Sequence, residues 1–196
     1  TSDGTRHAIP GTLLISAIAA VPDVTKTVTM DLKQAGNYLF IVGEMEGEMG
    51  GSHYNLVNGL TGGNVPTVDK EMAPRIFRAL HQAIKQGLIL SCHDLSEGGL
   101  AVAAAEMAFA GGVGIEISLA SNPVTDLFSE SNTRFLIEAR QENAKMVVSV
   151  FSDLVHTRIG RTTLEQSVRI ITPTGVLFVH ASLKDLKAHW QSGLNL

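Results

Sequence analysis

This sequence has little cysteine, few aromatic residues and no excess of basic charge, and two of these shortages exclude classes of protein. One cysteine among 196 residues excludes an internal disulfide framework and a zinc site built from cysteines. A formal net charge of −4 gives no basic surface of the kind that neutralises phosphates, which argues against nucleic-acid binding. With 44% hydrophobic and 17% charged residues, the composition is that of a globular protein.

Long hydrophobic runs are also missing. Asp, Lys, Glu or Gly interrupts every apolar run before it reaches the length of a membrane span. The start shows no basic segment followed by a small-residue cleavage site, so no signal peptide is predicted. We therefore expect a cytoplasmic location and no membrane partner. The chain starts TSDGTRHAIPG, without an initiator methionine, and we expect residues 1–196 to be a single domain cut from a longer protein.

What is present is an alternation of predicted strands and helices. The apolar run Thr12–Val21, TLLISAIAAV, predicts a buried strand, and residues 169–180 predict a hairpin around Thr172–Gly175. Further strands are expected at 37–43, 88–93, 113–119 and 133–140. Because the hairpin requires antiparallel pairing, we expect an α+β fold in which helices cover a mixed sheet.

The helix signals are clearest between Pro74 and Gln86. Ile76 and Leu80 share one face there, proline suits the first turn, and Gly87 supplies the stop. Further helices are expected at 98–110, 144–154 and 183–190, and one short helix within the glycine-rich residues 43–64. Glu106 is the only charge in the helix at 98–110, which must therefore be covered on most sides.

The stretch LILSCHDLSEGGLAVAAAEMAFAGG, residues 88–112, places a thiol, an imidazole and a carboxylate where a strand leads into this helix. A catalytic thiolate needs a base, but Cys92 and His93 are consecutive and point to opposite faces of a strand. A base would have to come from elsewhere in the fold. We therefore expect Cys92 to be a small buried apolar residue.

A ligand-binding turn is the second interpretation of this stretch. His93 and Asp94 end a strand, where ligands of layered α/β proteins collect, and they could orient a water, a metal or a substrate group. Gly98 and Gly99 would let a phosphate or another backbone approach the helix N-terminus. The alternative is that Asp94 and Ser96 only cap the helix and the two glycines only allow close packing.

A second candidate is EMGGSHY, residues 48–54. Gly50 and Gly51, followed by Ser52, could form an anion-binding nest that leads into a short helix. Glu44 and Glu48 could hold Mg²⁺ if a nucleotide supplied phosphates. The alternative is a surface loop with a serine-capped helix. Neither the P-loop pattern nor the dinucleotide-binding glycine pattern is present in a suitable context.

A third feature is LFSESNTRFLIEAR, residues 127–140. Glu130 and Arg134 flank a turn into a strand, and they could form an ion pair or present charges at an interface. An exposed pair contributes little stability. We favour a structural role for both residues.

Together these segments resemble a known family. The chain is similar to the C-terminal domain type of the aminoimidazole ribonucleotide synthetase superfamily, and more narrowly to the last such domain of the amidotransferase that acts on formylglycinamide ribonucleotide in purine synthesis. The resemblance covers nearly everything from Ile9 to Trp190, and the His-Asp-x-Ser-x-Gly-Gly-Leu run before an alanine-rich helix is its most specific part. Glu97 stands where the family usually has Asp, and His53 where it commonly has Glu or His.

The resemblance implies a three-layer α/β/α sandwich and a role in an ATP-dependent C–N ligase. ATP would activate the amide oxygen of the substrate, and ammonia from a glutaminase domain or subunit would displace the phosphate. ATP and Mg²⁺ would bind the full-length enzyme, largely on an N-terminal synthetase-type domain, and the isolated chain would be inactive. The resemblance assigns no catalytic residue here. The residues that it implies for lining or bracing the cleft are Gly50, Gly51, Ser52, His53, His93, Asp94, Ser96, Glu97, Gly98 and Gly99.

Two other interpretations remain open from the sequence. The chain could be a stand-alone regulatory or small-molecule-binding α+β module. It could also be the C-terminal domain of another member of the same superfamily, such as a selenide- or thiamine-phosphate-directed kinase. A synthetase-type domain encoded upstream of Thr1 would favour the amidotransferase.

Overall fold

The computed structural model describes residues 3–6, 8, 11, 14–120 and 122–193. Its elements follow one another as a mixture of helices and strands. They are the 3₁₀ turn Val24–Lys26, β1 (Tyr38–Val42), α1 (His53–Val57), α2 (Met72–Lys85), β2 (Ser91–Asp94), α3 (Gly99–Gly111), β3 (Gly114–Ser118), α4 (Pro123–Phe128), β4 (Phe135–Ala139), the 3₁₀ turn Gln141–Asn143, α5 (Ala144–Val150), β5 (His156–Thr163), β6 (Ser167–Ile171), β7 (Leu177–Ser182) and α6 (Leu183–Ser192).

The strands form one seven-stranded sheet in the order β2-β4-β1-β5-β3-β6-β7. Every neighbouring pair is antiparallel except β3 and β6, which run parallel. The mixed sheet expected from the hairpin is therefore confirmed. The hairpin itself is β6 and β7, closed by the turn from Thr172 to Gly175.

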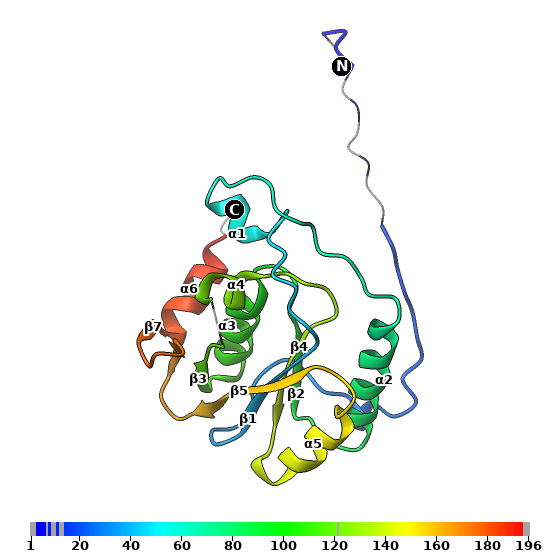
Figure 1. The fold of residues 1–196 in the computed structure, drawn as a ribbon, viewed down its shortest axis with the longest axis vertical. Coiled ribbons are helices and arrows are strands. Elements are labelled where there is room, and N and C mark those ends of the chain that lie inside the picture. Colours follow the sequence, from blue (N-terminus) through cyan, green and yellow to red (C-terminus); the bar gives the residue numbers. More distant parts are fainter. Residues whose placement is uncertain (1–2, 7, 9–10, 12–13, 121, 194–196) are drawn as a thin grey trace.

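Helices cover both faces of the sheet (Figure 1). Leu39 of β1 belongs to a core with α3 and α6, whereas its neighbour Phe40 points to a second core with Ile76 of α2 and Val147 of α5. This alternation along one strand is the pleat of a sheet that is buried on both sides. The three-layer arrangement is confirmed.

Only part of the second face is covered. Over β3, β5 and β6 that face carries ion pairs, with Glu116 lying 3.0 Å from Arg161 and 3.8 Å from Arg169. Helices α2 and α5 cover the half that contains β2, β4 and β1. Within the described residues, no helix is both long and apolar enough to cross a membrane.

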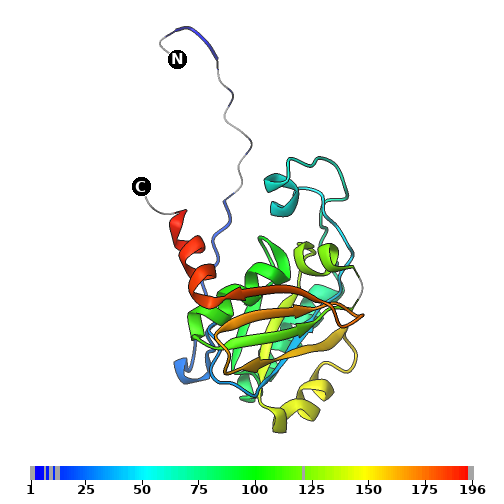
Figure 2. The same cartoon turned by 90° about the vertical axis from the view of Figure 1, so that its left-hand side faces the viewer.

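The expected helices and most expected strands are confirmed within a few residues. The alanine-rich helix is α3, and six of its residues are buried, including Met107 and Ala108. The helix expected from Pro74 is α2, which begins two residues earlier and ends at Lys85. The short helix in the glycine-rich passage is α1, which stands away from the sheet on a long loop (Figure 2).

One predicted strand is wrong. Residues 14–21 form no strand, and Leu14 and Ile18 are 88% and 100% exposed. An apolar segment becomes a buried strand only where a sheet edge and an apolar layer accept it. The edge at β2 is met instead by Thr29, which forms a single parallel bridge with Ser91. Thr12 and Leu13 lie outside the described residues.

One strand, β5, and one α-helix, α4, were not predicted from the sequence. β5 is the longest strand, but its sequence HTRIGRTT has one large apolar residue, so it lacks the hydrophobic pattern of a buried strand. Its pairing with β1 and β3 on either side places it in the sheet. Helix α4 is six residues long and carries Asn122 as its cap and proline in its first turn, a start signal that is visible in the sequence.

Candidate functional site

The cleft is a hollow of about 530 Å³ at the end of the sheet where β2 ends and β4 begins. It combines the end of the His-Asp stretch with the Ser-Glu-Ser turn and with part of the loop after α1. We define the cleft by its lining residues, which are Val65, Pro66, Phe77, Asp94, Leu95, Ser96, Glu97, Glu130, Asn132, Thr133, Arg134 and Phe135.

Asp94 is the carboxylate that β2 presents to this cleft. It ends the strand with 59% of its side chain exposed, and it accepts a hydrogen bond from the Ser96 hydroxyl. That bond is the main cause that lowers the pKa of Asp94 below its ordinary 3.8, with a smaller contribution from His93. Gly98 is the N-cap residue of α3, and no side chain of Asp94 or Ser96 makes a capping hydrogen bond there, so the capping role considered for them is wrong.

His93 points away from the cleft. Its ring is 17% exposed, and its Nε2 lies 2.9 Å from the Oε2 of Glu106 on α3. The ring is turned toward α3, although its Nδ1 still lies 3.4 Å from the Asp94 Oδ1. His93 contacts the site through the backbone, since its Nδ1 lies 2.7 Å from the Asp94 carbonyl oxygen.

Glu130 connects the two stretches predicted as candidate sites, residues 48–54 and 88–112. Its Oε1 accepts hydrogen bonds from the backbone N–H of His53 and of Gly98, both at 2.8 Å. The Nδ1 of His53 lies 3.3 Å from the same oxygen. The carboxylate therefore occupies the position at two helix starts that the sequence interpretation offered to a phosphate. Among the described ion pairs, Glu130 pairs with His53 and not with Arg134, so the ion pair considered with Arg134 is wrong. The two backbone hydrogen bonds support the structural role that the sequence favoured for Glu130.

Gly50 and Ser52 hold the loop before α1 in shape. A Cβ on Gly50 would lie 2.4 Å from the carbonyl oxygen of Gly63, and the Gly50 N–H donates to the Asn64 carbonyl at 2.8 Å. The Ser52 hydroxyl accepts from the N–H of Asn55 and caps α1. Gly51 has open space around it and a φ of +74°, which requires a glycine-like turn. This favours the serine-capped loop over an open anion nest.

Gly98 and Gly99 start α3 in close contact with its neighbours. A Cβ on Gly99 would lie 2.7 Å from the Ser129 carbonyl oxygen and 2.8 Å from that of Leu127. Glu97 just before them is exposed and lines the cleft. Gly99 thus allows close packing of α3 against the end of α4, while Glu97 stays exposed at the cleft.

Arg134 is a buried cation at the base of the cleft. It is 3% exposed, its Nη1 donates to the Ser129 carbonyl at 3.2 Å, and its Nε is buried without a hydrogen-bond partner among the described residues. Burial lowers the pKa of Arg134 to about 10, against the opposing effect of Asp126. The guanidinium therefore stays charged at neutral pH.

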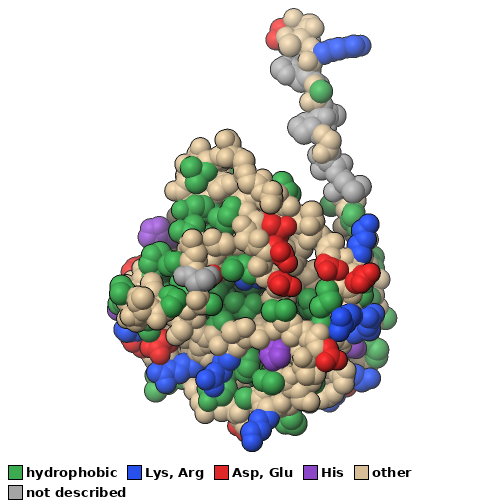
Figure 3. All heavy atoms as spheres, in the orientation of Figure 1, with side chains coloured by type: hydrophobic (Ala, Val, Ile, Leu, Met, Phe, Trp, Pro, Cys, Tyr) green, Lys and Arg blue, Asp and Glu red, His purple; other side chains and the backbone are tan. Residues whose placement is uncertain are grey.

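Arg134 also reaches a second, apolar hollow of about 150 Å³. Figure 3 shows hydrophobic side chains around the centre of this face, with a column of acidic side chains beside them. Most of the lining is aliphatic, and Asp126 and Arg134 are its charged residues. The lining residues are Ile41, Gly43, Met45, Leu100, Ile117, Ser118, Leu119, Ala120, Asp126, Arg134, Val155, Thr157 and Ile159.

The acidic residues considered for Mg²⁺ line a third, small hollow. Glu44 and Glu48 are both there, together with Glu46 and Asp69. Glu48 accepts from the Thr67 N–H at 3.3 Å, while its Oε2 is buried and has no hydrogen-bond partner among the described residues. Among the residues that the structure describes, no three ligating side chains converge closely enough to hold a metal ion.

Cys92 lies in the second core beside α2 and α5. Burial, with a smaller effect of Asp94, raises the pKa of its thiol from 9.0 to about 12. A thiol that stays protonated across the physiological range is neither a nucleophile nor a metal ligand. Cys92 is partly buried and packs as an apolar side chain against this core, which supports the expected packing role.

Comparison with known proteins identifies the family. The family described as "AIR synthase related protein, C-terminal domain" matches residues 34–172, which is most of the chain. The chain belongs to this family.

Among curated proteins, the chain is similar to "Phosphoribosylformylglycinamidine synthase subunit PurL" of Alkaliphilus metalliredigens. The two are 32% identical over 199 residues, which cover 99% of this chain and 26% of that protein. The chain therefore spans about a quarter of the length of this curated relative.

Solved structures share the fold. PurL of Thermotoga maritima complexed with ATP superposes with a TM-score of 0.70 at 17% identity, covering 83% of this chain and 27% of that one. The same protein complexed with FGAR gives a TM-score of 0.71 at 17% identity, over 83% of this chain and 30% of that one. The hydrogenase maturation protein HypE in complex with ATP gives 0.58 at 16% identity, over 81% and 55%.

Sequence reasoning missed several buried or hydrogen-bonded charges in and around the sheet. Glu138 is fully buried in β4, and its carboxylate accepts from Asn37 at 2.6 Å and Ser91 at 2.8 Å. The Glu106 bond to His93 and the burial of Arg134 were missed as well. The only signal for Glu106 was that it is the single charge on an otherwise apolar helix.

Proposed function

We propose that this chain is the C-terminal synthetase-type domain of an ATP-dependent formylglycinamide ribonucleotide amidotransferase of purine biosynthesis. In that role it closes one side of a nucleotide- and substrate-binding cleft whose other side is an N-terminal domain of the same parent protein. The observation that carries the proposal is the 32% identity to a phosphoribosylformylglycinamidine synthase subunit across 99% of this chain.

The reaction is a C–N bond formation. ATP phosphorylates the amide oxygen of formylglycinamide ribonucleotide, and ammonia then displaces that phosphate to give the amidine. Within this chain, the ionised Asp94 and exposed Glu97 are the side chains placed to meet ligand or partner at the cleft. Glu130 braces the two loops that form its wall.

The residues of this chain do not fit a complete site for ATP and Mg²⁺. The N–H groups of His53 and Gly98 that would bind a phosphate already donate to Glu130. The described residues include no group of three metal-ligating side chains. We therefore assign nucleotide and magnesium binding chiefly to the N-terminal domain, and we derive no catalytic step through either on this chain.

The exposed apolar segment before β1 supports the proposal that a neighbouring domain packs against this chain. Leu14, Ile15 and Ile18 are 77–100% exposed, which is costly for aliphatic side chains that have nothing to cover them. A neighbouring domain in the parent protein would bury them. Exposed apolar side chains of α1, among them Leu56 and Val57, add to the surface that such a domain would cover.

Ammonia must come from elsewhere. Glutamine hydrolysis needs a reactive thiolate, and the thiol of the single cysteine has its pKa raised to about 12 by burial. A separate glutaminase domain or subunit is therefore part of the proposal. The cytoplasmic location expected from the sequence remains a prediction.

The test uses the full-length parent supplied with ammonia and ATP. Phosphate should be released only when formylglycinamide ribonucleotide is added. Asp94→Ala should lower kcat/KM of the parent by roughly tenfold or more, about 1.4 kcal/mol or more of transition-state stabilisation, while the melting temperature changes little. Substrate-independent phosphate release, or equal loss of stability and activity in Asp94→Ala, would remove the support for this function.

A further inference from the structure

Glu106 connects two elements that are distant in the sequence. It is the only charged residue on α3, and 20% of its side chain is exposed. One carboxylate oxygen, Oε2, lies 2.9 Å from His93 Nε2 on β2. The other, Oε1, accepts from Trp190 Nε1 of α6 at 2.8 Å. A carboxylate on an otherwise apolar helix is tolerable because both of its oxygens are hydrogen-bonded.

His93 has no free ring nitrogen. Its Nδ1 lies 2.7 Å from the Asp94 carbonyl oxygen and its Nε2 lies 2.9 Å from a Glu106 carboxylate oxygen. A carbonyl and a carboxylate both only accept, so each contact needs a proton on the ring nitrogen that makes it. Nε2 is held by Glu106 on the opposite side of the ring. The imidazole is fixed at both ends, and through Nδ1 it fixes the peptide of Asp94. The same nitrogen lies 3.4 Å from the Asp94 Oδ1.

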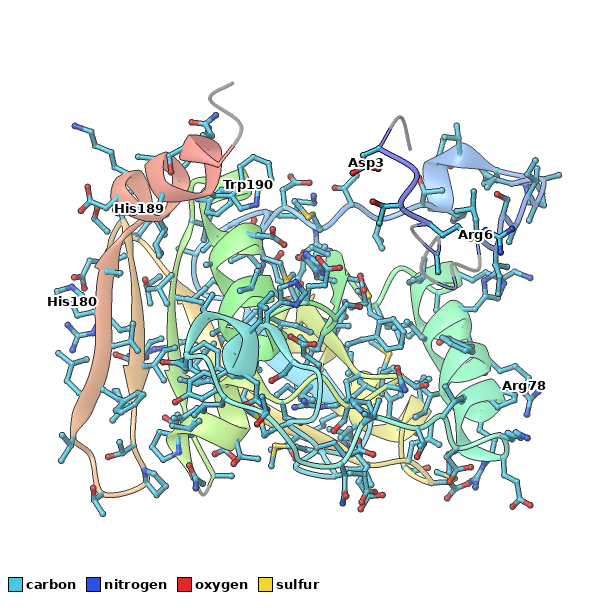
Figure 4. The ribbon with its side chains drawn as sticks, turned by 90° about the horizontal axis from the view of Figure 1, so that it is seen from above. Asp3, Arg6, Arg78, His180, His189 and Trp190 are labelled. Carbon is cyan, nitrogen blue, oxygen red and sulfur yellow. The ribbon has the colours of Figure 1, made fainter. Side chains whose placement is uncertain are left out.

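Trp190 holds the other end of this chain of contacts. Figure 4 shows it reaching from α6 toward α3. Its ring lies 5.7 Å from that of Phe109, and its N–H donates to Glu106, although half of the residue is exposed. A half-exposed indole is held in one orientation by these two contacts together.

We propose that Trp190, Glu106 and His93 form a positioning relay that sets the direction of the Asp94 carboxylate in the cleft. Helix α6 at the end of the chain thereby supports the site although none of its residues lines the cleft. The effect on turnover rests on the proposed function, whereas the effect on the geometry of His93 and Asp94 does not.

The matched variants separate the relay from plain packing. Trp190→Phe keeps an aromatic ring beside Phe109 but removes the N–H, together with one ring of the indole. Glu106→Gln keeps an acceptor for Trp190 and offers an amide donor to Nε2, so the ring stays held; Glu106→Ala removes both contacts. Glu165→Gln is the control, because Glu165, between β5 and β6, pairs with His180 of β7 at 3.3 Å and does not line the cleft.

The first readout is NMR of the 196-residue chain. We expect Trp190→Phe and Glu106→Ala to shift the imidazole ¹⁵N signals of His93 and the amide signal of Asp94. Glu106→Gln should move the Asp94 amide far less, and Glu165→Gln should move neither. Unchanged His93 and Asp94 signals in Trp190→Phe would overturn the relay, as would a shift at His93 that does not reach Asp94.

The second readout is turnover by the full-length parent. Trp190→Phe should lower kcat about 3- to 10-fold, less than the roughly 100-fold loss that follows a 1 Å misplacement, while KM and the melting temperature change little. Glu106→Gln should restore most of the activity that Glu106→Ala loses. Unchanged kcat despite shifted Asp94 signals would overturn the relay's role in the site. A parent without amidotransferase activity, with the NMR shifts intact, would overturn only the proposed function.

Discussion

At the scale of single residues, the local environment decides whether a titratable side chain is ionised at neutral pH. Cys92 and Asp94 stand two positions apart in one strand, but they face different environments. Burial raises the pKa of the Cys92 thiol to about 12, whereas a hydrogen bond from Ser96 lowers that of Asp94. The carboxylate is therefore ionised at the cleft, and the thiol is an apolar core group.

The Cys92 shift predicts a pH dependence of stability. The folded thiol keeps its proton up to a pH of about 12, while the unfolded thiol loses it above about 9. Between these values the unfolded state binds fewer protons, so stability falls as pH rises. From pH 8 to pH 10, the free energy of unfolding should fall by about 1.4 kcal/mol more in the native chain than in Cys92→Ala. Urea denaturation at both pH values tests this, and parallel losses in the two proteins would refute it.

Gly99 predicts a stability difference at the two ends of α3. Gly99 and Gly112 have φ values of +61° and +63°, but a Cβ meets carbonyl oxygens at 2.7 and 2.8 Å only at Gly99. Gly112→Ala should cost about 1 kcal/mol of unfolding free energy, from the left-handed backbone alone. Gly99→Ala should cost about 3 kcal/mol, because the overlap adds to that strain. Equal costs in chemical denaturation would show that α3 moves away from α4 freely.

At the scale of elements, tertiary pairing outweighs local pattern in both directions. The apolar segment 14–21 looks like a strand and forms none, while the polar sequence of β5 lies inside the sheet between β1 and β3. Strand preference mainly measures the fit to neighbouring strands and layers. A segment with a high strand preference forms no strand when no neighbouring strand pairs with it. A polar segment that lies between two strands is held in the sheet by its backbone hydrogen bonds.

The exposed segment predicts a difference between the chain and its parent. Ile18 is 100% exposed and Ile115 is 0% exposed. In the 196-residue chain, Ile18→Ala should change the free energy of unfolding by less than about 0.5 kcal/mol, whereas Ile115→Ala should cost about 2–5 kcal/mol. In the full-length parent, Ile18→Ala should lower the melting temperature if the proposed neighbouring domain covers that side chain. A parent as indifferent to Ile18→Ala as the chain would argue against such a contact.

At the scale of the whole molecule, two cores pack on opposite faces of one sheet, and the cleft opens at one end of it. The ligand-binding groups are incomplete there, since Glu130 occupies the helix starts and no metal cluster is found among the described residues. This arrangement suits one wall of a shared site.

Separate expression of the two parts of the parent tests this division. The 196-residue chain alone should show no turnover of ATP or glutamine. Mixing it with the separately expressed N-terminal part should restore ammonia-dependent amidation of formylglycinamide ribonucleotide. Phosphate release from ATP by the chain alone would contradict the division of labour.

The sequence by itself determined the class of fold, most of its elements and the family resemblance. Periodic apolar positions such as Ile76 and Leu80, glycines at turns, and the His-Asp-x-Ser-x-Gly-Gly run are local signals, readable before any chain folds. It also singled out Asp94, Ser96 and Glu97, which line the cleft, whereas Gly98 and Gly99 are not among the lining residues.

Only the tertiary structure decided what those residues do. It placed His93 between Asp94 and Glu106, brought Glu130 to both predicted loops across 77 and 32 residues of sequence, and left Ile18 uncovered. The physical reason is that hydrogen bonds between distant segments and the cover given by neighbouring layers depend on which elements become adjacent. The pattern along one stretch of chain does not contain that information.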